Sequence, residues 1–371
     1  MKRTTSTLLK NLSLVLAQNK PFVFYRKPNK KLVFQVVQTD NNIHYLEDFN
    51  QSGFVFAPFN NQEKTIVFPL DKSKIHQENF TVSTVNLKET AHTNFQQKEH
   101  TELVKNGIQY IKKNQTPKIV LSRRETVNKT LHIVNTFENL LNKYTTAFVY
   151  IWHHPKIGMW LGATPEILIQ TKNKHFKTMA LAGTQSYKNT LDVSWQQKEI
   201  EEHQFVSNYI FDELTKEKIS CQIHQTETVK AGNLLHLQAM ITGRMKNKNE
   251  LGKIINALHP TPAVCGLPKE TAKQFILENE SYDREFYTGF LGELNFKTDS
   301  RKRNNNRRNI ENHAYQFTEI QSNLFVNLRC MQVKKNQIYI YVGGGITKDS
   351  NPEKEYLETV AKAQVMKSII Q

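Results

Sequence analysis

The segment at residues 338–370, IYIYVGGGITKDSNPEKEYLETVAKAQVMKSII, decides the fold because it joins a strand closely to a helix. The β-branched and aromatic residues at 338–342 predict a strand. The run from Gly343 to Gly345 ends that strand and permits close approach of the backbone. Ser350 and Glu353 form a capping box around Pro352, so the sequence predicts a helix over 352–370.

Elsewhere the predicted strands and helices occur in groups rather than in strict alternation. This order favours an α+β fold, a single compact unit with large, mainly antiparallel β-sheets flanked by helices. Residues 1–95 form a β-rich N-terminal part without a motif. Strands are predicted at 22–25, 32–37, 54–56, 66–68, 118–121, 147–152, 167–170, 286–296 and 324–333, and helices near 103–111 and 194–216.

The composition fits a soluble globular protein. Of the 371 residues, 38% are hydrophobic and 23% are charged, which excludes a disordered chain. The three cysteines form no CxxC pair, so neither a disulfide framework nor a zinc site is indicated. The apolar run near the N-terminus is too short for a membrane span and predicts an amphipathic first helix. We therefore expect a cytoplasmic protein.

The formal net charge of +16 raises the question of a nucleic-acid partner. Much of the excess lies in one Asn-rich stretch, residues 297–308, which has no interleaved aromatic residues. That stretch is typical of a solvated loop between two strands, so neither nucleic acid nor membrane is expected as a partner. A general positive potential would instead steer an anionic substrate.

Two helices carry carboxylates beside apolar residues. In the C-terminal helix Glu358 continues the stripe of Ala361, Val365 and Ile369, with Glu355 one turn earlier and Lys362 one turn later. In the helix near 194–216, Glu202 precedes the stripe of Phe205, Val206, Tyr209 and Ile210. A surface Glu–Lys pair is the simpler interpretation of the first pattern. The alternative is that Glu202 and Glu358 share a Mg²⁺ ion, which prefers carboxylate oxygen.

Taken in order, several motifs give the chain a specific resemblance over residues 100–370. The chain resembles the chorismate-binding enzymes, a family that includes isochorismate, salicylate, anthranilate and aminodeoxychorismate synthases. The matching segments are KIVLSR (118–123), GATPE (162–166), ALAGT (180–184), Glu202-His203, LHPTPAV (258–264), DREFY (283–287), Leu328-Arg329 and GGGI (343–346), followed by Glu355, Glu358 and Lys362.

The resemblance implies a chorismate-binding catalytic region over residues 96–371 and a role for each matching residue. Glu202 and Glu358 would bind Mg²⁺, with Glu355 in or near the shell. Lys118 matches the general base that activates water, and Glu166 matches the general acid that protonates the departing hydroxyl. By themselves, these last two would be an ordinary strand lysine and turn glutamate.

Nine further matching residues are implied in substrate binding. Arg329, inside a predicted apolar strand, would bind a carboxylate of the substrate or form a structural ion pair. His259 is as compatible with packing as with substrate contact. The full set is Ala182, Gly183, Thr184, His259, Ala263, Tyr287, Arg329, Gly344 and Lys362.

Within the family, two positions select the reaction. Ala182 stands where the usual aminodeoxychorismate synthases have a nucleophilic lysine, and Lys118 favours water over ammonia as the nucleophile. The resemblance thus implies an isochorismate synthase in menaquinone or siderophore synthesis. We expect it to be a monomer that binds chorismate. The alternatives are a salicylate synthase, which also eliminates pyruvate, and a non-catalytic basic binding protein on the same scaffold.

Overall fold

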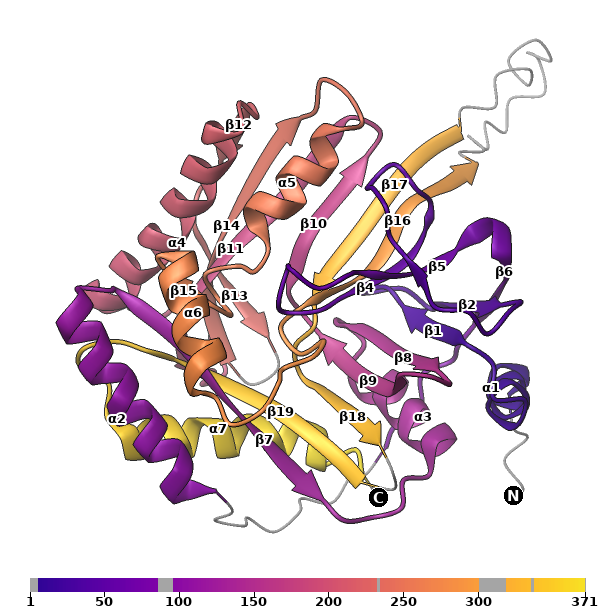
Figure 1. Ribbon diagram of the computed structural model, residues 1–371, viewed down its shortest axis with the longest axis horizontal. Helices are drawn as coiled ribbons and strands as arrows, with labels where there is room; N and C mark the ends of the chain where they lie inside the picture. The colour runs from indigo at the N-terminus through magenta and orange to yellow at the C-terminus, as the bar shows by residue number, and fades with distance from the viewer. Residues whose placement is uncertain (1–5, 86–95, 232–233, 300–317, 335–336, 371) are drawn as a thin grey trace.

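The computed structural model describes residues 6–85, 96–231, 234–299, 318–334 and 337–370 (Figure 1). The helices of this part are α1 (Thr7–Ala17), α2 (Gln97–Asn114), α3 (Ile133–Lys143), α4 (Gln197–Lys216), α5 (Glu250–Leu258), α6 (Lys269–Asn279) and α7 (Pro352–Lys367), with a short 3-10 turn, η1 (Leu70–Lys72). Within the same ranges, no helix is long and apolar enough to cross a membrane.

The strands form two antiparallel sheets, which confirms the predicted α+β class. Sheet A runs in the order β15 (Gly266–Leu267), β7 (Lys118–Val127), β19 (Gln337–Ile346), β18 (Cys330–Lys334), β9 (Gly158–Thr164), β8 (Phe148–His154), β1 (Phe22–Arg26), β2 (Leu32–Gln38), β6 (Ser73–Asn79). Sheet B runs β12 (Cys221–Ile223), β14 (Leu234–Arg244), β11 (His175–Ser186), β10 (Ile167–Lys172), β17 (Thr318–Val326), β16 (Phe290–Asp299), β4 (Gly53–Ala57), β5 (Ile66–Pro69), β3 (His44–Tyr45), with β13 (Glu227–Ala231) paired to β14.

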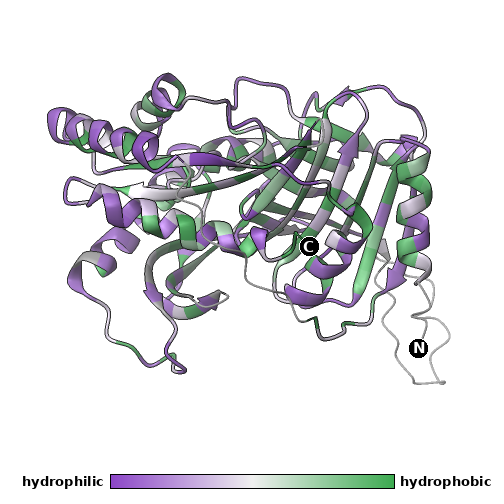
Figure 2. Cartoon of the chain, turned by 90° about the horizontal axis from the view of Figure 1, so that it is seen from below, coloured by the Kyte–Doolittle hydropathy of each residue, from purple (hydrophilic) through white to green (hydrophobic). Residues whose placement is uncertain are grey.

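An aromatic core packs the two sheets together. Phe148 of sheet A stacks on Phe325 of sheet B with ring centroids 4.3 Å apart, and Phe56 meets Trp152 at 5.1 Å. Among the described residues, this cluster includes none from β7, β11 or β14. Separate apolar clusters join sheet B to α4 and α5 and sheet A to α1, α3 and α7. Figure 2 shows the strands rich in apolar residues and most helices with one apolar and one polar face.

Four sequence predictions of local structure are corrected. The strand expected over 324–333 is interrupted, because β17 ends at Val326 and β18 begins at Cys330. The strand expected from 286 begins only at Phe290. Helix α7 is capped by Asn351, whose side chain accepts from the amide of Lys354, rather than by Ser350, and it ends at Lys367. Of the loop predicted over 297–308, residues 297–299 extend β16 and the rest lies outside the described residues.

A buried carboxylate ties the two sheets together through hydrogen bonds. Glu293 of β16 is 1% exposed and accepts from the Tyr25 hydroxyl at 2.7 Å and from Lys27 Nζ at 3.0 Å. We expect Glu293→Ala to lower the free energy of unfolding by about 3 kcal/mol, because removing one partner leaves the other groups unpaired in the interior. Urea denaturation measures this. Glu319→Ala is the control, because its ion pair with the exposed Lys172 should contribute less than about 1 kcal/mol to the free energy of unfolding. An equal loss in both variants would contradict the prediction.

Candidate active site

The glycine run lies inside β19, which continues to Ile346 rather than ending at the glycines as predicted, and sheet A narrows there. Strand β7 pairs with β19 as far as Ile346, whereas the pairing with β18 on the other side stops at Ile340. Beyond that point the carbonyl of Gly343 accepts a hydrogen bond from Lys362 Nζ at 3.0 Å. A Cβ at Gly344 would lie 3.5 Å from Glu355 Oε2. The run therefore forms a floor against which side chains of α7 lie.

The predicted base and one predicted metal ligand meet beside this floor. Lys118 begins β7 and is 9% exposed, and its Nζ lies 2.6 Å from Glu202 Oε1 on α4. The first turn of α4 is fixed by a capping box, in which Glu199 accepts from the backbone amide of Gln196 at 2.8 Å. Glu199 is thus a capping residue, and Glu202 one turn later reaches the amine.

The acidic residues of α7 lie on its less buried side. Glu358 Oε1 pairs with Lys362 Nζ at 2.7 Å, and the Glu358 side chain is 45% exposed. The predicted stripes were partly wrong, because Ala361 and Phe205 are exposed. Helix α7 buries a different face against sheet A. Glu355, Glu358 and Lys362 lie together along one edge of this buried face. Its buried residues are Tyr356, Thr359, Ala363, Met366 and Lys367.

The predicted acid is buried in the link between β9 and β10. Glu166 is 7% exposed, and Thr261 Oγ1 donates to its Oε1 at 3.4 Å. Burial raises the pKa of Glu166 to about 7, although the hydrogen bond from Thr261 and the charges of Lys118 and Arg329 oppose the rise. Glu166, Lys118 and Arg329 are therefore close enough to interact electrostatically. A carboxyl with this pKa can carry a proton near neutral pH.

Arg329 lies in a bend rather than inside a strand, which corrects the sequence prediction. It occupies the break between β17 and β18 with a φ of 47°. Burial lowers its pKa, and the charges of Tyr144 and Glu166 favour the cationic form. The bend gives the site a cation that a continuous strand would have placed differently.

The residues predicted at 182–184 lie at an irregularity of β11. The register against β14 shifts between Ala182 and Gln185, and Gly183 has a φ of 68°, a value that favours glycine. The carbonyl of Gly183 accepts from Nδ1 of His236 at 2.9 Å. The backbone of Thr184 belongs to the same irregularity.

Sequence reasoning missed His236, which the structure brings into this group. Burial is the main cause of its lowered pKa, and the charged groups that act on it include Arg329, Lys362 and Glu358. It thus links β14 and β11 to the charged edge of α7. The one signal in the sequence is a histidine between two buried leucines, Leu235 and Leu237, of an apolar strand.

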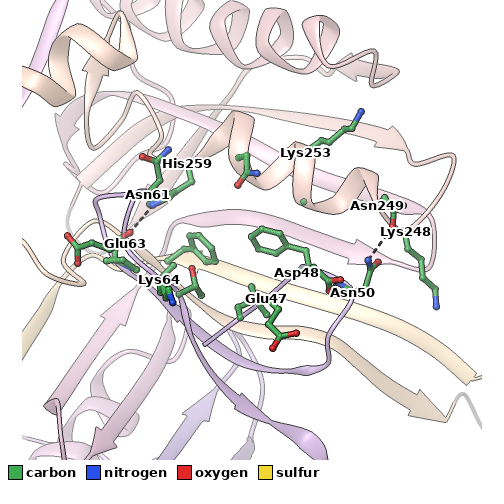
Figure 3. Close-up of a pocket in the computed structure, with 18 residues that line it drawn as sticks. Glu47, Asp48, Asn50, Asn61, Glu63, Lys64, Lys248, Asn249, Lys253 and His259 are labelled. Atoms are coloured by element: carbon green, nitrogen blue, oxygen red, sulfur yellow. Dashed lines mark hydrogen bonds between the residues drawn. The ribbon is translucent and has the colours of Figure 1, made fainter. Parts of the chain in front are cut away.

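The predicted substrate-binding residue His259 faces a cavity that Lys118 and Glu166 do not line. His259 is 5% exposed and donates from Nε2 to the carbonyl of Pro58 at 2.9 Å. It lines a separate cavity of about 610 Å³ between α5 and the segments 46–50 and 57–65 (Figure 3), whose walls include none of Lys118, Glu166 or Glu202. The hydrogen bond to Pro58 fits the packing interpretation of His259, and its contact with substrate stays a prediction.

Tyr287 lies against the glycine run on the same face of β19 as Lys118, because Gly343 and Gly345 are two residues apart in the strand. Ala263 lies in a turn. Tyr287 is 3% exposed and stacks on Tyr341 with centroids 5.3 Å apart, and its hydroxyl would lie 3.1 Å from a Cβ at Gly343. Burial raises the pKa of Tyr287. Ala263 is half-buried in a turn closed by the Val264 amide and the Thr261 carbonyl. These contacts pack Tyr287 against β19, and its part in substrate binding stays a prediction.

Gly345 offers a direct test of the floor. A Cβ there would lie 2.6 Å from Cε and 3.2 Å from Nζ of Lys118, so the lysine must move. We expect Gly345→Ala to retain the fold and lower kcat about tenfold or more, since small misplacement of a catalytic group is costly. Gly252→Ala on α5 is the control, because its new Cβ would lie 2.9 Å from Cδ2 of Phe49 and so also displaces a side chain, but away from Lys118. Unchanged turnover in Gly345→Ala would separate Lys118 from the reaction.

The donor chemistry of this group fits a hard divalent ion. In the described part of the chain, no cluster of three or more His, Cys, Asp or Glu side chains has the arrangement of a metal site. Glu202 and Glu358 instead each contact a lysine ammonium, which shows that both carboxylates attract a cation. Oxygen ligands of this kind suit Mg²⁺.

Comparison with known proteins supplies the family context. The sequence pattern of a protein family described as "chorismate binding enzyme" matches residues 55–301 of this chain. A second family pattern with the same description matches residues 318–368. Isochorismate synthase DhbC of Bacillus subtilis is 26% identical over 56% of this chain and 49% of its own length. Isochorismate synthase EntC of Escherichia coli K12 is 26% identical over 69% of this chain and 62% of its own. The chain thus spans about half to three-fifths of these relatives.

Solved structures share the fold. The menaquinone-specific isochorismate synthase MenF of Escherichia coli superposes with a TM-score of 0.76 at 17% identity, over 100% of this chain and 92% of that one. Anthranilate synthase component I of Streptococcus pneumoniae gives 0.65 at 19% identity, over 94% and 90%. At these identities the likeness concerns architecture alone.

Proposed function

Because the chain belongs to the chorismate-binding enzyme family, we propose that it is an isochorismate synthase, which adds water at C2 of chorismate and removes the hydroxyl at C4. One observation carries the proposal. The amine of Lys118 contacts Glu202 and also lies within electrostatic range of the buried acid Glu166. An amine and a protonated carboxyl are the two groups needed to activate one hydroxyl and release another.

The proposed chemistry assigns one step to each residue. In its neutral amine form Lys118 takes a proton from water as that water attacks C2, and Glu166 gives a proton to the hydroxyl leaving C4, so one water enters and one departs. The proton that Lys118 carries as an ammonium beside Glu202 has to leave before this step. Arg329, Lys362 and the backbone at Gly183 and Gly344 would bind the substrate. Ala182 and Thr184 are further proposed substrate-binding residues.

Glu202 and Glu358, with Glu355 beside them, would hold Mg²⁺. The ion would anchor the ring carboxylate of chorismate and neutralise charge as the 4-hydroxyl leaves. Two lysines now contact these carboxylates, and ammonium groups are replaceable by a divalent ion of higher charge. We also propose that the protein acts as a cytoplasmic monomer, with chorismate as its ligand, in menaquinone or siderophore synthesis.

Metal removal should abolish activity. We expect chelation to stop turnover and Mg²⁺ to restore it, and we expect Glu202→Gln and Glu358→Gln to raise the Mg²⁺ concentration needed by about tenfold or more. Glu201→Gln is the matched control, because that carboxylate is exposed and bonds only a neighbouring side chain on α4 in the contacts that the structure describes. Activity that survives chelation would rule out the metal.

Product analysis after incubation with chorismate and Mg²⁺ tests the proposal as a whole. Isochorismate without pyruvate is the expected result. Stoichiometric pyruvate would instead assign a salicylate synthase, since that reaction eliminates it. No conversion, together with strongly salt-dependent binding of nucleic acid, would favour a non-catalytic basic protein.

A further inference from the structure

A buried charged cluster holds the face of α7 that packs on sheet A, next to the edge that carries Glu355 and Glu358. At its centre is Arg123 of β7, which is 4% exposed. Its Nε donates to Thr359 Oγ1 at 2.8 Å, and its Nη1 donates to Glu125 Oε2 at 3.2 Å. Glu125 also pairs with Lys367, near the end of α7. Two polar links therefore join one strand to one helix.

The cluster is costly to bury, so its retention calls for a role. Burying ions away from water costs free energy that well-packed apolar residues would avoid. The buried face of α7 mixes Thr359 and Lys367 with Tyr356, Ala363 and Met366. Apolar contacts alone tolerate small rotations and shifts of a helix, whereas a hydrogen bond with one donor and one acceptor selects a single arrangement. The cluster thus specifies where α7 sits.

The contacts of Arg123 fall on the residues that directly follow the two acids of the site. Thr359 follows Glu358, and Tyr356 follows Glu355. The guanidinium carbon lies 5.3 Å from the centroid of the Tyr356 ring. The Thr359 hydroxyl, which accepts from Arg123, donates to the carbonyl of Tyr356 at 2.7 Å. One side chain of β7 thereby fixes both turns of α7 that carry carboxylates.

Strand β7 also begins with Lys118, five residues before Arg123. We propose that Arg123 is a positioning residue, which sets the rotation and axial register of α7 so that Glu355 and Glu358 face the site beside Lys118. This inference rests on the proposed function, in which those carboxylates hold a divalent ion. The rigid backbone of β7 then carries the amine and the anchor of the acidic helix on one element.

The experiment measures Mn²⁺ binding to the purified full-length chain by electron paramagnetic resonance of the free ion, with no turnover needed. Thr359→Val removes the hydroxyl and keeps the shape, and we expect about 10- to 100-fold weaker Mn²⁺ affinity. Thr359→Ser, which keeps the hydroxyl, should restore affinity. Arg123→Gln should weaken binding at least as much as Thr359→Val.

Two controls separate positioning from general destabilisation. Thr136→Val removes another buried helical hydroxyl, which bonds the His132 carbonyl on α3. Arg26→Gln removes another buried arginine, which donates to the carbonyls of Leu141 and Tyr144. Both should leave Mn²⁺ affinity unchanged, whatever they do to the melting temperature.

The outcomes are distinct. If the unaltered protein binds Mn²⁺ and Thr359→Val binds it equally well, the positioning role is overturned and the proposed function stands. If Thr136→Val weakens binding as much as Thr359→Val, the effect is one of stability and the positioning role again fails. If the unaltered protein binds no Mn²⁺, the metal-dependent function and the inference built on it fall together.

Discussion

Replacing Lys118 by alanine is expected to lower kcat for isochorismate formation by about 10²- to 10⁴-fold, the usual contribution of a positioned general base. The side chain begins β7 and its amine contacts Glu202, so its removal deletes the group that would take the proton from water. Steady-state assays with saturating Mg²⁺ measure the loss. The fold should persist, because the backbone pairing of β7 with β19 continues through Ile119 to Val127.

Lys354→Ala provides the control for this variant. Lys354 is exposed on α7, so its loss should leave kcat within about twofold. Thermal melts of both variants distinguish loss of the base from loss of structure. Full turnover in Lys118→Ala would assign the base to another group.

The second large effect concerns Glu166 and pH. With its pKa raised by burial to about 7, the carboxyl is protonated below that pH and loses its proton above it. As a proton donor it works only when protonated, so kcat/KM should fall as pH rises through about 7. Glu166→Gln cannot donate and should lose about 10²-fold or more in kcat at every pH. A pH profile that stays flat from 6 to 8 would exclude this role.

Stability should also fall as pH rises, because the same buried group must then ionise. The pKa of Glu166 is near 7 in the folded protein and near 4.5 in an unfolded chain, so ionising the buried group costs about 3 kcal/mol. The cost is absent below about pH 4.5, grows as pH rises, and is complete above about 7. Glu166→Gln should therefore be more stable than the unaltered protein at pH 8 and similar at pH 4.5. Urea denaturation at the two pH values checks this.

Local sequence patterns predicted the elements whose apolar residues are continuous. Strands β1, β2, β4 and β8 match runs of aromatic and β-branched residues almost to the residue. Strand β6 reads SKIHQEN and is mostly exposed, so no local signal marks it. It forms because β2 supplies its hydrogen-bonding partner along its full length. Pairing of this kind is a property of the folded sheet rather than of the strand.

The sequence predicted which residues belong to the candidate site better than it predicted how they are arranged. The break at Arg329 has no local signal, because it depends on Asn327, whose side chain bonds Tyr150 and the Phe286 carbonyl far along the chain. Contacts with Arg123 and with sheet A determine which face of α7 is buried. The apolar stripe through Ala361 therefore predicted the wrong face. The roles of the individual residues remain predictions that the variants above address.

The placement of the N-terminal strands limits how this protein can be divided. Strand β1 lies between β8 and β2, and β4 lies between β16 and β5, so early residues occupy interior positions of both sheets. A fragment beginning at residue 96 would expose the bare edges of β8 and β16 together with the aromatic side chains that pack on β1 and β4, which invites aggregation. The first quarter of the chain is thus no detachable accessory, and insertions are better tolerated in the loops than in these strands.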